Sequence, residues 1–152
     1  MKKIVFASCF FLLAGVFSAM AAETKNIGFI KNTSGQVLIG RAQEMIPAKV
    51  NDKLFPNDNL ITGENGSVGV ILQDNSVLSL GPKSKVNFSN FVFNPVEEKS
   101  SFVAKIRKGT VVYLTGLIAK LNPQAVRFET PTAVCGVRGT HFAIKVDAPK
   151  ED

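Results

Sequence analysis

The chain has 152 residues, of which 45% are hydrophobic and 20% charged, and its formal net charge is +6. A chain of this length suits one domain with its own hydrophobic core, and it argues against several domains. With two cysteines and a single histidine, the composition also excludes a disulfide framework and a three-histidine zinc site.

The N-terminal residues have the pattern of a secretory signal peptide. Two lysines at positions 2 and 3 precede an apolar run over residues 4–17, and small residues at 18–22 supply an A-x-A cleavage site. This run is shorter than the ~20 apolar residues that span a bilayer. We therefore predict a signal peptide over residues 1–21, rather than a retained membrane anchor or lipid attachment at Cys9. The protein is then expected in the periplasm or outside the cell, with no transmembrane anchor.

The mature chain is mildly basic. Without Lys2 and Lys3, 16 basic residues stand against 12 acidic ones, a net charge of +4, and the charges are scattered. The local basic group of Lys105, Arg107 and Lys108 lies on a predicted strand, whose alternation with apolar residues turns the first two toward solvent. Since no aromatic residues interleave with this group to stack on bases, we expect no nucleic-acid binding.

The rest of the chain has the pattern of short strands separated by turns. Apolar residues alternate at 27–30, 37–39, 68–72, 78–80, 86–88, 102–106, 111–113, 126–128 and 142–146. Turn-forming residues stand at 32–35, 56–58, 64–66, 74–75, 81–82, 94–95 and 122–123. This spacing predicts an all-β domain over residues 22–147, an antiparallel β-sandwich or β-roll of jelly-roll-like form. One helical turn is predicted at 117–121, and a flexible tail at 148–152.

Several acidic and glycine residues are predicted to form turns rather than sites. Asp74 and Asn75 lie between two alternating runs and predict a two-residue hairpin, because asparagine tolerates positive φ. Asp58, Gly63 and Glu64 also stand near turns, where Asp usually bonds its own backbone. Their spacing does not fit the calcium loop D-x-[DN]-x-[DN]-G.

The C-terminal part holds the most informative segment of the chain. A strand with Val126 and Phe128 on one face runs into Pro131, and a second alternating strand follows Thr140. The connecting loop contains glycines on either side of an arginine. The residues of this candidate structural or interaction loop are Thr130, Pro131, Gly136, Arg138, Gly139 and Thr140.

Arg138 has two interpretations. A guanidinium forms several hydrogen bonds in a fixed plane. In the structural interpretation, which we favour, Arg138 is buried or half-buried and ties the loop to backbone carbonyls, or to a carboxylate such as Asp58 or Asp74. In the functional interpretation, Arg138 contacts an anion or carboxylate ligand from an exposed loop.

His141 and Cys135 are the remaining candidates for chemistry. His141 is predicted on the outward face of its strand, as a surface residue rather than a general base. Cys135 is the sole cysteine after signal removal, and we predict a small buried apolar residue beside Val134 and Val137. A reactive thiol, or a disulfide between chains, is the alternative. No nucleophile–base pair, paired carboxylates or phosphate loop is evident, so we predict no enzyme, no metal and no cofactor.

Residues 130–142 resemble the terminal motif of the FecR domain, a bacterial cell-envelope module, in which T-P-x-A is followed by G-V/I-R-G-T-x-F. Four upstream segments are similar to further motifs of this family. They are residues 57–66 (G-D-x-L-x-T-G-x-x-G, with Asn57 in the first glycine place), 72–76 (L-x-D-G-S/T), 80–84 (L-x-P-x-S) and 108–111 (a glycine opening a strand). The resemblance covers about residues 35–147.

This resemblance implies a non-catalytic module for envelope signalling or for binding another envelope protein. The alternatives are a carbohydrate- or peptidoglycan-binding accessory module, and an envelope scaffold that self-associates through a strand edge. Sugars usually stack on flat aromatic side chains, and this chain has no tryptophan and one tyrosine, Tyr113. Its 12 phenylalanines suit a core better than a sugar site. The sequence does not specify the oligomeric state.

Overall fold

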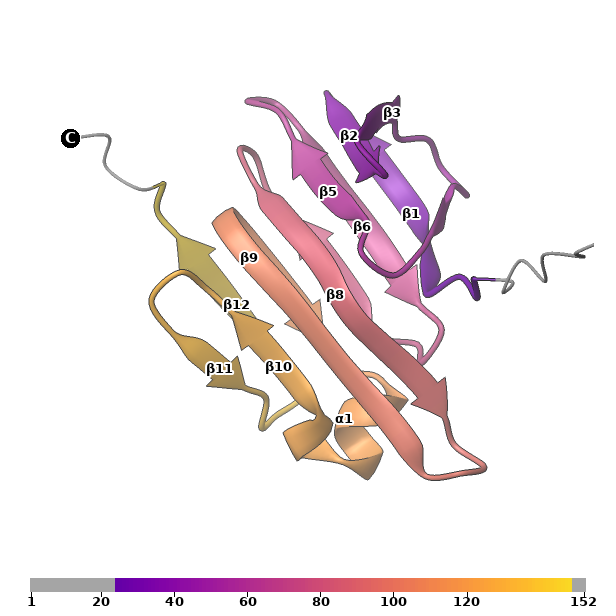
Figure 1. The fold of residues 1–152 in the computed structure, drawn as a ribbon. Coiled ribbons are helices and arrows are strands. Elements are labelled where there is room, and N and C mark those ends of the chain that lie inside the picture. Colours follow the sequence, from indigo (N-terminus) through magenta and orange to yellow (C-terminus); the bar gives the residue numbers. More distant parts are fainter. Residues whose placement is uncertain (1–23, 149–152) are drawn as a thin grey trace, which may run out of the picture.

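The computed structural model describes residues 24–148, which form twelve strands, the short helix α1 (Leu117–Leu121) and a 3-10 turn (Pro123–Ala125) (Figure 1). The predicted signal peptide and residues 149–152 of the predicted tail lie outside the described residues. The strands are β1 (Gly28–Ser34), β2 (Val37–Arg41), β3 (Glu44–Pro47), β4 (Lys53–Leu54), β5 (Asn59–Thr62), β6 (Ser67–Leu72), β7 (Val77–Leu80), β8 (Lys85–Asn94), β9 (Lys99–Leu114), β10 (Val126–Glu129), β11 (Val134–Gly136) and β12 (His141–Val146). The all-β prediction and the helical turn at 117–121 are confirmed.

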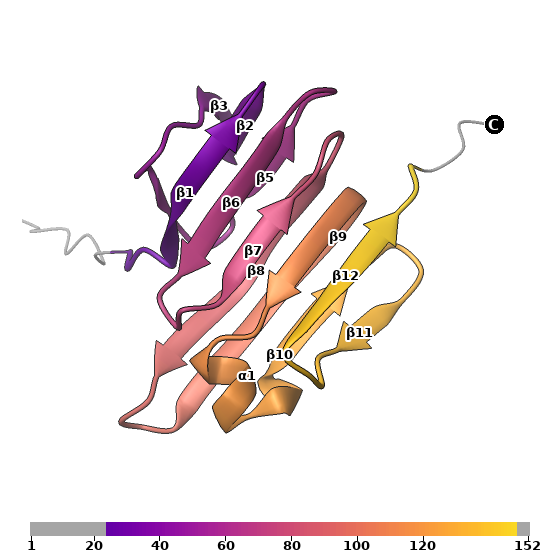
Figure 2. The same cartoon turned by 180° about the vertical axis from the view of Figure 1, so that it is seen from behind.

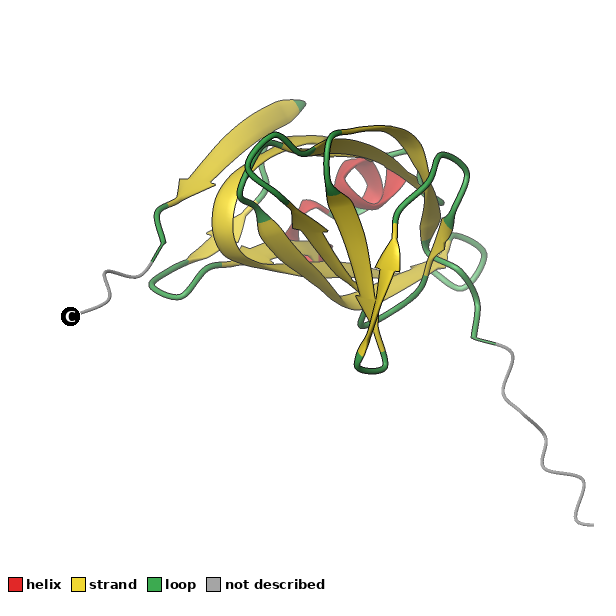
Figure 3. Ribbon diagram, turned by 90° about the horizontal axis from the view of Figure 1, so that it is seen from above, coloured by secondary structure: helices red, strands yellow, loops and turns green. Residues whose placement is uncertain are grey.

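The strands form two layers that share β9, and together they curl into a half-barrel (Figures 1 and 2). One layer has the order β4-β1-β6-β7-β9-β12, and the other has the order β3-β2-β5-β8-β9-β10-β11. The first half of β9 pairs with β8 and β10, and its second half pairs with β7 and β12. Seen from above, the sheet wraps around the core, and the strand that leads to the C-terminus stands at one margin (Figure 3).

The change of layer along β9 occurs at Gly109. This residue has φ +97°, and a Cβ there would overlap the Oγ and Cα atoms of Ser84. Only glycine adopts such a backbone without strain. The bend therefore needs a glycine at this position. Gly109 lies inside the continuous strand β9, whereas the resemblance to the family had implied that it opens a new strand.

One strand pair departs from the predicted antiparallel arrangement. β10 runs parallel to β9, with Val126 beside Phe102 and Glu129 beside Lys105. A parallel pair needs a crossover connection instead of a tight turn. Helix α1 and the 3-10 turn supply that connection, which is why the helical turn lies between these two strands.

The core follows the predicted alternation. On β9, Phe102 and Ala104 are buried while Lys105 and Arg107 are exposed. Aromatic residues gather where β9 packs beside β10 and β12. The ring centroids of Tyr113 on β9 and Phe128 on β10 lie 5.0 Å apart. Phe102, Phe91 and Phe142 complete this aromatic cluster. Four of the eight described phenylalanines pack in this cluster, and they stabilise the core.

The hairpin between β6 and β7 is one residue longer than predicted. The N–H of Leu72 donates to the carbonyl of Ser76 at 2.9 Å, which closes a three-residue loop over 73–75. Asn75 has the positive φ (+63°) that the sequence predicted for the turn. A three-residue loop of this kind ends in a left-handed residue, and asparagine fills that place.

Candidate functional site

A buried polar network joins three of the motif segments. The hydroxyl of Thr62 donates to the Gly81 carbonyl at 2.7 Å and accepts from the Ser84 N–H at 2.9 Å. The Thr110 N–H in turn donates to the Ser84 hydroxyl at 3.1 Å. Gly63 follows Thr62 and donates its N–H to the Gln36 carbonyl at 2.9 Å. These motif residues therefore hold separate strands together, and they do not form a binding site.

Asp58 is the centre of a second structural contact. Its side chain is only 1% exposed, and it accepts hydrogen bonds from Arg41 Nε (2.9 Å), Arg41 Nη2 (2.7 Å) and the Phe55 N–H (2.8 Å). The Arg41 guanidinium also lies 4.6 Å from the centroid of the Phe55 ring. The hydrogen bonds that Arg41 donates to Asp58 raise the pKa of Arg41, and partial burial opposes this effect. Asp58 thus bonds its local backbone, as predicted for a turn, and also a distant arginine.

Asp74 connects its hairpin to helix α1. Its carboxylate accepts hydrogen bonds from the N–H and hydroxyl of Ser76, and from the Ile118 N–H at 3.2 Å. Its carbonyl accepts from the Leu117 N–H at 2.8 Å. Asp74 is fully buried, so this carboxylate anchors the helix rather than meeting a ligand.

The hydroxyl of Tyr113 is buried near the same place and makes no hydrogen bond in the described structure. Burial raises its pKa to about 12, from the ordinary value of 10.0. Ser76 and the Gly116 backbone oppose this rise in pKa, but less strongly than burial promotes it, and neither forms a hydrogen bond with the hydroxyl. An unpartnered buried hydroxyl costs stability.

Arg138 does not have the place that the sequence predicted. Its side chain is exposed, and no hydrogen bond or ion pair is found for it among the described residues. Arg41 and the Ser76 and Ile118 groups already satisfy the two carboxylates proposed as its partners. The structural interpretation of Arg138 is therefore wrong, and this guanidinium is available to a ligand.

The other loop residues are largely exposed as well. The Thr130 hydroxyl closes a small turn with Ala133, from whose N–H it accepts at 3.0 Å. His141 is exposed, as predicted, and its Nδ1 lies 3.3 Å from the Thr140 hydroxyl. Cys135 is a free thiol and is half-buried instead of buried, while Val134 beside it is 67% exposed. The loop is thus a surface feature of the fold.

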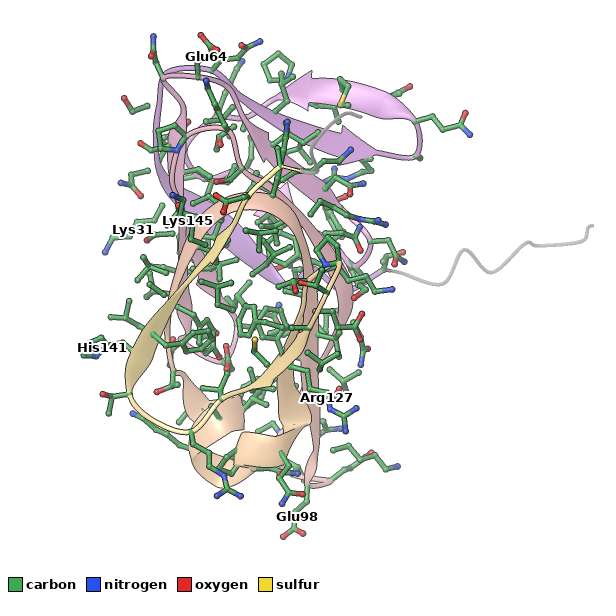
Figure 4. The ribbon with its side chains drawn as sticks, turned by 90° about the vertical axis from the view of Figure 1, so that its left-hand side faces the viewer. Lys31, Glu64, Glu98, Arg127, His141 and Lys145 are labelled. Atoms are coloured by element: carbon green, nitrogen blue, oxygen red, sulfur yellow. The ribbon has the colours of Figure 1, made fainter. Side chains whose placement is uncertain are left out.

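A groove runs between the β10–β11 hairpin and β12, and we call it the C-terminal groove. Its volume is about 530 Å³, and its walls consist of Thr130, Pro131, Thr132, Ala133 and Cys135 on one side and Ile144, Lys145, Val146 and Asp147 on the other. In Figure 4 the two walls face the viewer, with His141 projecting outward from β12 on one side and Arg127 outward on the other.

The groove is apolar inside and polar at its rim. Ile144 and Val146 are half-buried and turn toward the core, because β12 alternates as predicted. Lys145 and Asp147 form an exposed ion pair at 3.7 Å on the rim. On the outer face of the other wall, Lys105 pairs with Glu129 at 3.7 Å. This arrangement suits an occupant with apolar side chains along one face.

The described residues contain no group of three or more His, Cys, Asp and Glu side chains placed to hold a metal ion. Over the same residues, no helix has the length and apolar character needed to cross a membrane.

Comparison with known proteins identifies the family to which these motifs belong. The family model of the FecR protein matches residues 58–151. The chain belongs to the FecR family. FecR domains are envelope-associated modules of regulation and signalling rather than enzymes.

Comparisons with solved structures and with curated proteins add nothing to the family assignment. A solved structure described as a cell surface anchoring domain is 28% identical, with a TM-score of 0.40, and the match covers 41% of this chain and 84% of that chain. At this TM-score the likeness supports no inference. The search of curated proteins found no match.

The FecR match begins at Asp58 and so includes the buried networks, the bend at Gly109 and the C-terminal groove. Arg41 lies before the match, and sequence reasoning missed it. Its partner Asp58 was identified as a turn residue and as a possible partner of Arg138, and no local motif could indicate a pairing with Arg41 across 17 positions. The groove itself was missed because the pattern of β12 gives its inward face but not the absence of a neighbouring strand.

Proposed function

We propose that this FecR domain is a non-catalytic module of the periplasm or cell surface, which takes part in envelope signalling by binding a protein through the C-terminal groove. One observation carries the proposal: the T-P-x-A part of the family's terminal motif, residues 130–133, lines an open, apolar groove. An extended segment of a partner suits such a groove, because the groove is apolar and the strand β12 beside it pairs on one edge only in the described structure. The partner is expected to be another envelope protein.

The exposed position of Arg138 supports a binding role for the loop. A guanidinium with no internal partner is free to pair with a carboxylate of the bound protein, and such pairs fix orientation. The sugar-binding alternative has less support. Phe29 is the one aromatic residue among the more exposed large hydrophobic side chains of the described structure, and it lies on β1, far along the sheet from the loop.

The experiment combines capture with a probe in the groove. A photoreactive residue replaces Thr132 on the groove wall, and in a matched control it replaces Glu64 in an exposed turn. Both proteins are exported in native cells and irradiated. A protein that cross-links at position 132 but not at position 64 is then identified and purified. When it is added to the Cys9→Ser variant of this chain, it is expected to slow the reaction of Cys135 with a thiol reagent.

Arg138→Ala should reduce both the cross-link and the protection of Cys135. Capture that is equal at both positions, or capture without protection of Cys135, would contradict the proposal.

The proposed export to the periplasm or cell surface is tested separately. The intact mass of the exported protein should correspond to a chain that begins at Ala22, and a mass that includes residues 1–21 or an added lipid would contradict this prediction.

A further inference from the structure

The outer edge of β12 is a free hydrogen-bonding edge. All six residues of β12 pair with β9, and the next pair along the ladder is joined by the Thr115 N–H, which donates to the Thr140 carbonyl at 2.9 Å. Bonds to one neighbour alternate along an antiparallel strand. The even-numbered residues of β12 therefore bond β9, and His141, Ala143 and Lys145 direct their N–H and C=O groups away from the sheet.

The other edge strands of the described structure are protected against pairing. β4 has two residues and β11 has three, while β3 ends at Pro47 and carries Glu44. Short strands, proline and charge are the usual means of protecting an edge. β12 is six residues long and contains no proline or glycine. Its one charged side chain, Lys145, is balanced by Asp147 at 3.7 Å.

The inner face of β12 is also incompletely covered. Phe142, Ile144 and Val146 are each only half-buried, and the last two line the C-terminal groove. A strand added beside β12 would continue its layer and lay its own inward side chains over this groove. The added strand therefore needs apolar residues at every second position.

A second copy of β12 has this pattern, and only certain registers keep its apolar face inward. A shift of one residue would turn every apolar side chain outward. Among the registers that keep the faces aligned, one places Ile144 opposite Ile144 of the second copy, and Phe142 opposite Val146. The same register places His141 opposite Asp147, a pairing of a potential cation with an anion.

The neighbouring register is less favourable. If Ala143 lay opposite Ala143 of the second copy, Lys145 would face His141, and Asp147 would face Gly139 and lose a polar partner. In the alignment on Ile144, the outward N–H and C=O groups of residues 141, 143, 145 and 147 can all bond to the second copy. This alignment therefore forms a longer hydrogen-bonded ladder than the alignment on Ala143.

We propose that β12 pairs antiparallel with β12 of a second copy of this chain, about a two-fold axis at Ile144. Each copy then covers the C-terminal groove of the other. This inference rests on the proposed function only in using the same groove, and it names a second copy as one of the proteins that bind there.

A proline on the free edge tests the pairing. The N–H of Ala143 points outward, so Ala143→Pro removes an edge donor without breaking the ladder to β9. Met45 offers a matched control on β3. The Ala48 N–H donates to the Val37 carbonyl at 2.9 Å, so the even-numbered residues of β3 form the hydrogen bonds to β2. The N–H of Met45 therefore points away from β2, on another edge of the sheet. Circular dichroism should show that both variants keep the β fold before their oligomeric states are compared.

Sedimentation of the exported protein over a range of concentrations gives the oligomeric state. The parent and Met45→Pro are expected to dimerise, and Ala143→Pro is expected to dimerise at least about tenfold more weakly, because two symmetric hydrogen bonds are lost. A parent that stays monomeric, or a dimer that Ala143→Pro leaves intact, overturns the inference. A monomer that still captures an envelope protein at position 132 overturns the inference but leaves the proposed function standing.

Cysteine cross-linking tests the register. In a Cys9→Ser, Cys135→Ser background, Ile144→Cys places two thiols opposite each other at a non-hydrogen-bonded pair, where Cβ atoms come close enough for a disulfide. Ala143→Cys places its thiol opposite Lys145 instead. Oxidation should yield a covalent dimer with Ile144→Cys and little with Ala143→Cys. The reverse result would exclude the axis at Ile144.

Discussion

Replacing Tyr113 with phenylalanine removes one hydroxyl group and leaves the aromatic ring in place. The ring packs between Phe102, Phe128 and Phe142, with centroids 5.0 to 6.0 Å away. The hydroxyl is buried and has no hydrogen-bond partner. Burying an unsatisfied group of this kind costs about 1–3 kcal/mol. Tyr113→Phe is therefore expected to leave the free energy of unfolding unchanged or raise it by up to this amount.

The pH dependence of the free energy of unfolding also reports on the buried hydroxyl of Tyr113. Burial raises the pKa of Tyr113 to about 12, whereas in the unfolded chain it stays near its ordinary 10.0. Between these values the unfolded chain loses the proton and the folded chain keeps it. The resulting stabilisation is fully present below pH 10 and is lost as pH rises toward 12, at about 1.4 kcal/mol per pH unit.

Denaturant melts of parent and Tyr113→Phe at pH 8, 10 and 11 measure this difference. All other titratable groups are common to both proteins, so the difference between the two isolates Tyr113. It is the one tyrosine of the chain, and its phenolate absorbance can be followed directly. A tyrosine that titrates near 10 in the folded protein, or a variant that is less stable by 1 kcal/mol or more at pH 8, would refute the reasoning.

Three further substitutions test the structural contacts by denaturant melts. Arg41→Ala leaves the buried Asp58 carboxylate without its ion pair, and because Arg41 is 36% exposed we expect a loss of about 2 kcal/mol, below the range for fully buried pairs; a loss under 0.5 kcal/mol would contradict this. Gly109→Ala should cost more than 2 kcal/mol, since φ +97° and Ser84 both oppose a Cβ; a variant as stable as the parent would show that β9 does not need its bend. Arg138→Ala should stay within about 0.5 kcal/mol of the parent, like His141→Ala, because both side chains are exposed; a clear loss for Arg138→Ala alone would restore a structural role.

The sequence was sufficient to predict features that depend on local pattern. The period-two alternation around Phe102 and Phe128 gave the inward faces of β9 and β10, because a buried strand face must be apolar. Asn75 was identified as a turn residue from its tolerance of positive φ, and this is where the loop turns. These predictions hold because neighbouring residues alone determine them.

Features that join distant segments were beyond the sequence. Asp58 pairs with Arg41 rather than Arg138, since the strand order brings β2 and not the C-terminal loop to this carboxylate. Two flanking glycines suggested a constrained guanidinium, but they lie in a loop with open space around both positions. The parallel pairing of β10 also depended on how the crossover packs. In each case the missing information was which strand lies beside which.

Strand β9 has a consequence for the order in which this chain can fold. It spans Lys99–Leu114 and bonds to four other strands, two in each layer. Until these residues have been synthesised, β7 and β8 each present an unpaired edge, and no strand pairing of the described structure joins the two layers. Exposed edges of this kind make partly folded chains prone to aggregation. The amides of β9 should accordingly be the last to exchange with solvent in the folded protein, and a chaperone that serves this chain would need to hold its first half until β9 emerges.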